Sequence, residues 1–238
     1  MIMTTIADNL QQTLARIAAA ARANGVDPQR VRLLAVTKTF GPEAVLAAWQ
    51  AGQHAFGENY VQEAVEKIAA VDGLLPPGAQ RPEWHLIGPL QANKTRLAAT
   101  HFDWVHSVDR ERIAQRLAEQ RPAELGPLQV CLQVNIDSGG NKSGVAPEQT
   151  LALAQSVLQH PRLVLRGLMT IPEPSDNGAD QIAVHRRARA LFDDVRAKLG
   201  AAAAAMDTLS MGMSADLESA IACGSTLVRV GTAIFGKR

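Results

Sequence analysis

The feature that most constrains the fold is an alternation of short apolar runs with helical segments along the whole chain. Runs rich in Val, Ile and Leu that are apolar on both faces are typical of strands in a parallel sheet covered by helices. Eight such runs occur, and each is followed by a segment of helical periodicity or a single helical turn. The expected strands are residues 32–38, 54–57, 84–88, 103–108, 128–135, 163–170, 208–210 and 227–230.

Eight strands alternating with helices predict a single α/β barrel of the TIM-like (β/α)8 type. An open doubly wound sheet is the runner-up, but no GxGxxG motif follows the first strand. An amphipathic helix over about residues 5–24 precedes the first strand, and we expect it to fill a gap in the outer ring of helices. Asp109 is expected to cap the helix after the fourth strand. We expect residues 1–238 to form one domain.

Composition argues against several classes of protein. Lys plus Arg is 24 against 23 for Asp plus Glu, and no basic tract is interleaved with aromatic residues, so no nucleic-acid partner is expected. The start lacks the features of a signal peptide and no apolar stretch reaches membrane-spanning length, so we expect a cytoplasmic protein without a membrane partner. The two cysteines and the six histidines show no metal-ligand spacing, so no metal is expected. Cys131 and Cys223 are interpreted as small buried hydrophobic residues.

Lys38 is the most informative residue at the strand ends. It closes the first apolar run, and lysine is rarely buried without a partner because desolvating an ammonium is costly. Taken alone, it fits a solvated strand end better than a reactive amine. Chemistry in such barrels gathers at the carboxyl ends of the strands, where a dry mouth would favour a neutral amine. The other strand ends therefore decide between the two interpretations.

The ends of the seventh and eighth strands resemble a phosphate site. Barrels often bind phosphate with the loops after these two strands and the N-terminus of a short extra helix. Gly231 and Thr232 offer backbone N–H groups at the start of the last helical turn, and Ser210 and Ser214 add hydroxyl donors. The glycines are equally consistent with ordinary turn residues.

A phosphate site that faces a lone lysine predicts a phosphorylated aldehyde as the ligand. Pyridoxal 5′-phosphate (PLP) fits, because its aldehyde forms an imine with a neutral lysine amine. Arg229, two residues before Gly231, is then expected beside the pyridine nitrogen, which an arginine keeps unprotonated. The ring is a weaker electron sink in that state, which disfavours demanding carbanion chemistry.

Six segments, in one order across the chain, resemble the pyridoxal phosphate homeostasis protein family. The resemblance implies a fold like the N-terminal barrel of bacterial alanine racemase, with PLP as cofactor. The segments are LLAVTK (33–38), FGENYVQE (56–63), EWHLIGPLQANK (83–94), NKSG (141–144), RGLMTIP (166–172) and LSMGMSADLESAIACGSTLVRVGTAIFG (209–236).

The resemblance also implies roles for individual residues. Lys38 matches the family's Schiff-base lysine, Arg229 the arginine beside the pyridine nitrogen, and Asn59 an asparagine near the cofactor. Phosphate contacts are matched by Ser210, Ser214, Gly231 and Thr232. Met211 is expected to pack under the cofactor ring or simply to fill space. His85 is interpreted as a hydrogen-bonded core histidine rather than an acid or base.

The favoured function is a non-catalytic carrier that holds and releases PLP in vitamin B6 and amino-acid homeostasis. Its expected partners are PLP and, as transient recipients, PLP-dependent apoenzymes, and we expect a monomer. The alternative is a PLP-dependent amino-acid racemase, which needs a second base opposite the lysine. Barrel racemases take that base from a tyrosine on a separate β-domain, whereas this chain has only Tyr60 and ends where that domain would begin. A sugar-phosphate enzyme would need paired carboxylates at the strand ends, and these are not apparent.

Overall fold

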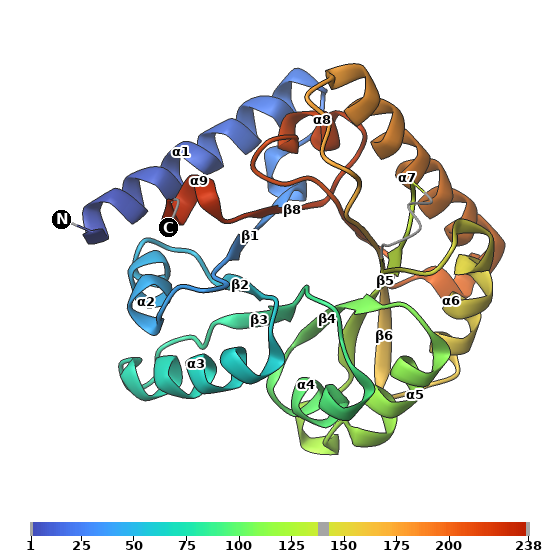
Figure 1. Ribbon diagram of the computed structural model, residues 1–238, viewed down its shortest axis with the longest axis horizontal. Helices are drawn as coiled ribbons and strands as arrows, with labels where there is room; N and C mark the ends of the chain where they lie inside the picture. The colour runs from blue at the N-terminus through green and yellow to red at the C-terminus, as the bar shows by residue number, and fades with distance from the viewer. Residues whose placement is uncertain (1, 138–142, 237–238) are drawn as a thin grey trace.

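The chain folds into a closed barrel of eight parallel strands that hydrogen-bond in the order β1 to β8 (Figure 1). The computed structural model describes residues 2–137 and 143–236. This architecture confirms the predicted TIM-like barrel. The strands are β1 (Arg32–Val36), β2 (Ala55–Glu58), β3 (Glu83–Leu86), β4 (Trp104–Val108), β5 (Leu128–Val134), β6 (Leu163–Thr170), β7 (Thr208–Ser210) and β8 (Leu227–Val230).

Helices surround the barrel, and the N-terminal helix closes their ring (Figure 1). This helix, α1, packs against α2, α8 and α9, as predicted for a segment that fills the gap between the first and last helices. No helix among the described residues is both long and apolar enough to cross a membrane. The helices are α1 (Ile2–Ala23), α2 (Pro42–Gln50), α3 (Val61–Leu74), α4 (Thr95–His101), α5 (Glu111–Gln120), α6 (Thr150–Leu158), α7 (Gly178–Leu199), α8 (Leu217–Ala222) and α9 (Thr232–Phe235).

The strands separate an outer apolar core from the barrel interior. Because successive side chains of a strand point to opposite faces, Trp84 and Leu86 of β3 face the helices and belong to the large outer core, whereas His85 faces inward. The inner layers include two small apolar clusters, one around Leu34 and Leu227 and one around Trp104. Polar side chains occupy much of the remaining interior, and they matter for the site.

Two expectations about local structure need correction. The first strand ends at Val36 rather than at Lys38, because Thr39 adopts a left-handed backbone (φ 68°) and the Phe40 N–H donates to the Thr37 carbonyl, which turns the chain away. Asp109 does not cap α5: the cap position is Arg110, which makes no side-chain cap. The Asp109 carboxylate instead pairs with the Arg110 guanidinium at 2.6 Å.

Other sequence expectations hold or fall partly outside the described residues. Strands β6, β7 and β8 have the predicted bounds. Cys131 and Cys223 are buried and unbridged, as predicted. The NKSG segment (141–144) falls partly in residues 138–142, which are outside the described part of the chain.

Candidate functional site

A cavity of about 810 Å³ opens where the carboxyl ends of β1, β2 and β8 meet the loop after β7. Six of the eight residues predicted to bind a cofactor line it, although they come from distant parts of the sequence. Those six are Lys38, Asn59, Ser214, Arg229, Gly231 and Thr232. The geometry therefore brings an amine, a guanidinium and hydroxyl and backbone donors to one hollow.

Lys38 lies in the loop just above β1 and is exposed at this cavity. Within the described chain its amine makes no hydrogen bond or ion pair. The sequence predicts a water-free cavity mouth around Lys38, but the structure places this side chain at an exposed position. The reason is that β1 ends two residues earlier, at Val36, so Lys38 lies in the loop. An exposed, unpaired amine remains accessible to an aldehyde.

A buried charged cluster holds the backbone on both sides of Lys38. On one side, the Thr37 hydroxyl donates to the Glu58 carboxylate at 2.6 Å, and the Lys67 ammonium donates to the same carboxylate at 2.7 Å and to the Thr37 carbonyl at 2.8 Å. On the other side, the Thr39 N–H donates to the Glu63 carboxylate at 3.0 Å. A β-branched residue rarely adopts a positive φ, so the surrounding contacts must maintain it. The loop that carries the amine is therefore rigidly anchored.

Asn59 directly follows β2 and lies against the turn after β3. A Cβ built at Gly88 would lie only 2.1 Å from the Asn59 carbonyl oxygen, so this close approach requires glycine. Asn59 also lines a second, neighbouring cavity of about 280 Å³ together with Ile87 and Ile171, which are shared by both hollows. The asparagine thus stands at the boundary between the two.

The loop after β7 places Ser214 at the cavity. Gly212 has a φ of 91°, and a Cβ there would meet the Ala220 side chain at 2.5 Å, so both the turn and the packing require glycine. The Ser214 carbonyl accepts a hydrogen bond from Arg16 of α1 at 3.2 Å. The N-terminal helix therefore helps to shape the site.

Arg229 is 3% exposed and lines the cavity from β8. Its Nη1 donates to the Ser210 carbonyl at 2.8 Å and to the Ser210 Oγ at 2.7 Å, and its Nη2 donates to the Thr170 carbonyl at 2.8 Å. Burial lowers the pKa of Arg229 to about 10, against the opposing charge of Asp216, so the guanidinium stays positive at neutral pH. The site holds a fixed, buried cation.

The sequence matches the family described as "Alanine racemase, N-terminal domain" over residues 7–238. The pyridoxal phosphate homeostasis protein of Pseudomonas aeruginosa is 55% identical over 237 residues, which cover 99% of this chain and 97% of that protein. Its counterpart in Escherichia coli (strain K12) is 50% identical over 236 residues, covering 99% and 98%. The chain belongs to the pyridoxal phosphate homeostasis protein family.

Solved structures agree with membership of this family. PipY of Synechococcus elongatus, solved with PLP bound, is 37% identical with a TM-score of 0.78, and the match covers 94% of this chain and 100% of that one. A protein from Bifidobacterium adolescentis has a TM-score of 0.90 at 34% identity, covering 98% and 96%. Alanine racemase of Corynebacterium glutamicum, at 16% identity and a TM-score of 0.71, shares the fold over 62% of its length.

Two residues predicted to contact the cofactor lie off the cavity wall in this family member. Ser210 is fully buried and hydrogen-bonds Arg229 instead. Met211 is fully buried in the outer apolar core. Adjacent residues at a strand end point to opposite faces of the sheet, so Met211 faces the helices while Ser210 faces the barrel interior and contacts Arg229.

Sequence reasoning also missed several residues of the site. Phe40 lines the cavity and packs on Phe235, with ring centroids 5.3 Å apart. His106 and Glu83 contact His85 inside the barrel. Period-two spacing could have placed 83 and 85 on one face of a strand, but the partner strand's register is not visible in one sequence.

Proposed function

We propose that this chain binds PLP in the cavity at the carboxyl end of the barrel, as a Schiff base on Lys38, and serves as a non-catalytic carrier in vitamin B6 and amino-acid homeostasis. The observation that carries the proposal is the meeting of Lys38, Arg229 and Ser214 at one cavity. The 37% identical PipY, solved with PLP bound, supports the same ligand.

The donors at the cavity fit the three parts of PLP. The unpaired amine of Lys38 suits the aldehyde, which adds amines with loss of water. The fixed cation of Arg229 suits a pyridine nitrogen that stays unprotonated and accepts a hydrogen bond. The ring is then a weak electron sink, which suits a protein that holds the cofactor rather than one that uses it.

The phosphate is assigned to Ser214, Gly231 and Thr232. A Cβ at Gly231 would lie 3.1 Å from the Val36 carbonyl oxygen, so glycine suits the close packing of this strand end against β1. The hydroxyls of Ser214 and Thr232 and the first N–H groups of α9 are suitable donors. Asn59 is assigned to the rim of the cofactor site.

The composition of the cavity wall favours a carrier over a racemase. Among the described residues that line it, Lys38 and Arg229 are the only ionisable ones. A racemase needs a second base, and Tyr60, the one tyrosine of the chain, is 57% exposed and does not line the cavity. An open mouth also favours exchange of the cofactor with solvent or a recipient.

We further propose that residues 1–238 act as one PLP-binding domain. The carrier is proposed to be a cytoplasmic monomer whose transient recipients are PLP-dependent apoenzymes. Across residues 2–137 and 143–236, no group of three or more His, Cys, Asp or Glu side chains is arranged to hold a metal ion. PLP is therefore the one cofactor proposed.

Replacement of Lys38 tests the proposal. The PLP-loaded protein should be yellow, and Lys38→Ala should abolish the imine absorbance because no other amine lines the described cavity wall. Lys198→Ala, on the surface of α7, is the matched control and should keep the spectrum. Imine absorbance that survives in Lys38→Ala would refute the assignment.

The racemase alternative has its own test. PLP-loaded protein is incubated with L-alanine and other L-amino acids, and the products are separated by chiral chromatography. The carrier proposal predicts no accumulation of D-isomer above a protein-free PLP control. Clear accumulation would favour the racemase.

A further inference from the structure

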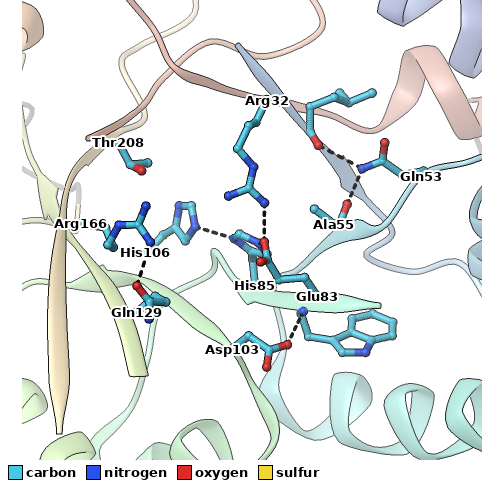
Figure 2. A network of polar contacts seen from close by, with 12 residues as sticks. Arg32, Gln53, Ala55, Glu83, His85, Asp103, His106, Gln129, Arg166 and Thr208 are labelled. Atoms are coloured by element: carbon cyan, nitrogen blue, oxygen red, sulfur yellow. Dashed lines mark hydrogen bonds and ion pairs between the residues drawn. The ribbon is translucent and has the colours of Figure 1, made fainter. Parts of the chain in front are cut away.

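A chain of polar side chains, each in hydrogen-bond contact with the next, runs from Arg229 through the barrel interior. We call it the file, and its members are Arg229, Ser210, His106, His85 and Glu83. Arg229 donates to the Ser210 Oγ at 2.7 Å, and this oxygen lies 3.2 Å from the His106 Nδ1. The His106 Nε2 lies 2.9 Å from the His85 Nδ1. Both histidines are fully buried, and Figure 2 shows their rings pointing toward each other from β3 and β4.

The file ends in a charged pair at the opposite mouth of the barrel. The His85 Nε2 lies 2.6 Å from the Glu83 Oε1, which also accepts from the Arg32 guanidinium at 2.5 Å (Figure 2). Glu83 and Arg32 are partly exposed and line a separate cavity of about 500 Å³ at the amino ends of the strands. The polar file therefore connects the cofactor cavity to the far mouth.

The chemistry of the groups assigns a direction to every hydrogen bond. A carboxylate only accepts, so the His85 Nε2 must carry the proton that meets Glu83. Burial lowers the pKa of His85 against the opposing effect of Glu83, and burial holds the pKa of His106 well below its usual value, so the neutral form of both rings is favoured near pH 7. A neutral ring has one N–H, so the His85 Nδ1 accepts from the His106 Nε2–H.

The same argument assigns the direction of the hydrogen bonds between His106, Ser210 and Arg229. The His106 Nδ1 is then bare and must accept from the Ser210 hydroxyl. That hydroxyl directs its oxygen lone pairs to Arg229, and every donor in the file points away from the cofactor cavity. Each buried polar atom along it is satisfied.

Arg229 depends on this file more than an ion-paired arginine would. Its side chain has no ion pair with a carboxylate in the described part of the chain, so neutral oxygens alone orient it. A buried polar network contributes little net stability compared with apolar packing of the same volume, so stability alone does not account for two buried imidazoles here. A role in orienting the Arg229 guanidinium accounts for them.

We propose that Glu83, His85 and His106 are positioning residues for Arg229: a one-directional hydrogen-bond relay that fixes the Ser210 oxygen as an acceptor and so aims the guanidinium at the cofactor cavity. Its effect on PLP rests on the proposed function. The direction of the relay does not depend on that function.

Histidine NMR tests the relay in the full chain without cofactor. Two-bond ¹⁵N–¹H correlation spectra near neutral pH should show His85 and His106 as neutral rings protonated at Nε2. In Ser210→Ala, the His106 Nδ1 resonance should shift because its donor is lost. A protonated imidazolium, or an Nδ1–H tautomer at either ring, would overturn the proposal whether or not PLP binds.

PLP titration tests the effect on Arg229. His106→Leu should weaken PLP affinity about tenfold and shift the absorption maximum of the bound cofactor, because unsatisfied buried groups and a loosened guanidinium follow. His106→Gln, which keeps one donor and one acceptor, should restore most of both. Asp207→Asn removes a carboxylate paired with Arg166 at the same mouth but outside the relay, and should change affinity less than about twofold.

The outcomes separate the two proposals. An unchanged spectrum and affinity in a folded His106→Leu would overturn the positioning role while leaving PLP binding intact. Wild-type protein that fails to bind PLP would refute the proposed function, while the NMR result would still decide the direction of the relay.

Discussion

The two reactive sides of the cavity are supported in different ways. On the Lys38 side, the buried ions Glu58 and Lys67 hold the backbone between β1, β2 and α3, and the amine itself is left unpaired. On the Arg229 side, neutral groups inside the barrel hold the guanidinium directly. An amine that must react has to stay free, whereas a cation that orients a ring has to stay fixed. The difference in support follows this difference in task.

The largest expected effect comes from breaking the charged support. Lys67→Met leaves the Glu58 carboxylate buried without its cation, and we expect a loss of about 3–5 kcal/mol in the free energy of unfolding. Removing both charges in Lys67→Met with Glu58→Leu should recover most of it. Urea unfolding measures both. A double variant as unstable as the single one would mean that the ion pair is not the source of the effect.

A smaller loss is expected from the neutral support. Ser210→Ala removes a hydrogen-bond partner from both Arg229 and His106 but leaves no charge newly unpaired, so we expect about 1–3 kcal/mol. Ser219→Ala on α8, which loses one hydrogen bond to Gln181, is the control and should cost less than about 1.5 kcal/mol. If Ser210→Ala destabilised more than Lys67→Met, the contrast between the two sides would be wrong.

The smallest effect concerns acid stability at the far mouth. Burial alone would raise the pKa of Glu83, but the His85 hydrogen bond and the Arg32 charge lower it from 4.5 to about 2. A carboxylate with a depressed pKa in the folded state stabilises the protein above its unfolded pKa and loses that contribution as the pH falls toward 2. Glu83→Gln should therefore lose stability at neutral pH and show a flatter decline between about pH 5 and 2.

Unfolding followed by circular dichroism across this pH range checks the acid limb. Glu66→Gln, an exposed substitution on α3, serves as the matched control. A Glu83→Gln protein whose decline is as steep as that of the wild type would show that Glu83 does not contribute to the acid limb.

The sequence predicted the barrel well because strand burial leaves a local signal. Most residues of β6 and β8 are apolar, the short β7 is buried throughout, and the bounds of all three are as predicted. The first strand was extended too far because the left-handed turn at Thr39 has no glycine to mark it. Local patterns report burial reliably, but they report a turn only when its residue type is unusual.

The site was predicted less completely for a different reason. The six predicted residues that line the cavity stand at strand ends, where barrel topology alone brings residues together. They are Lys38, Asn59, Ser214, Arg229, Gly231 and Thr232. Ser210 and Met211 do not line the cavity, because Ser210 contacts Arg229 inside the barrel and Met211 packs in the outer core. The relay needed the pairing of β3 with β4, which places His85 opposite Trp104, two residues before His106 on the same face of the strand. Interstrand register of this kind is absent from a single sequence.

Borohydride trapping tests the central claim most directly. Protein loaded with PLP is reduced with borohydride, digested and mapped by mass spectrometry. We predict one phosphopyridoxyl mass increment, on the peptide that contains Lys38 and at that residue. An increment located on Lys67, Lys94 or Lys198, or none on any peptide of a protein that had turned yellow, would contradict the assignment of Lys38 as the cofactor-bearing amine.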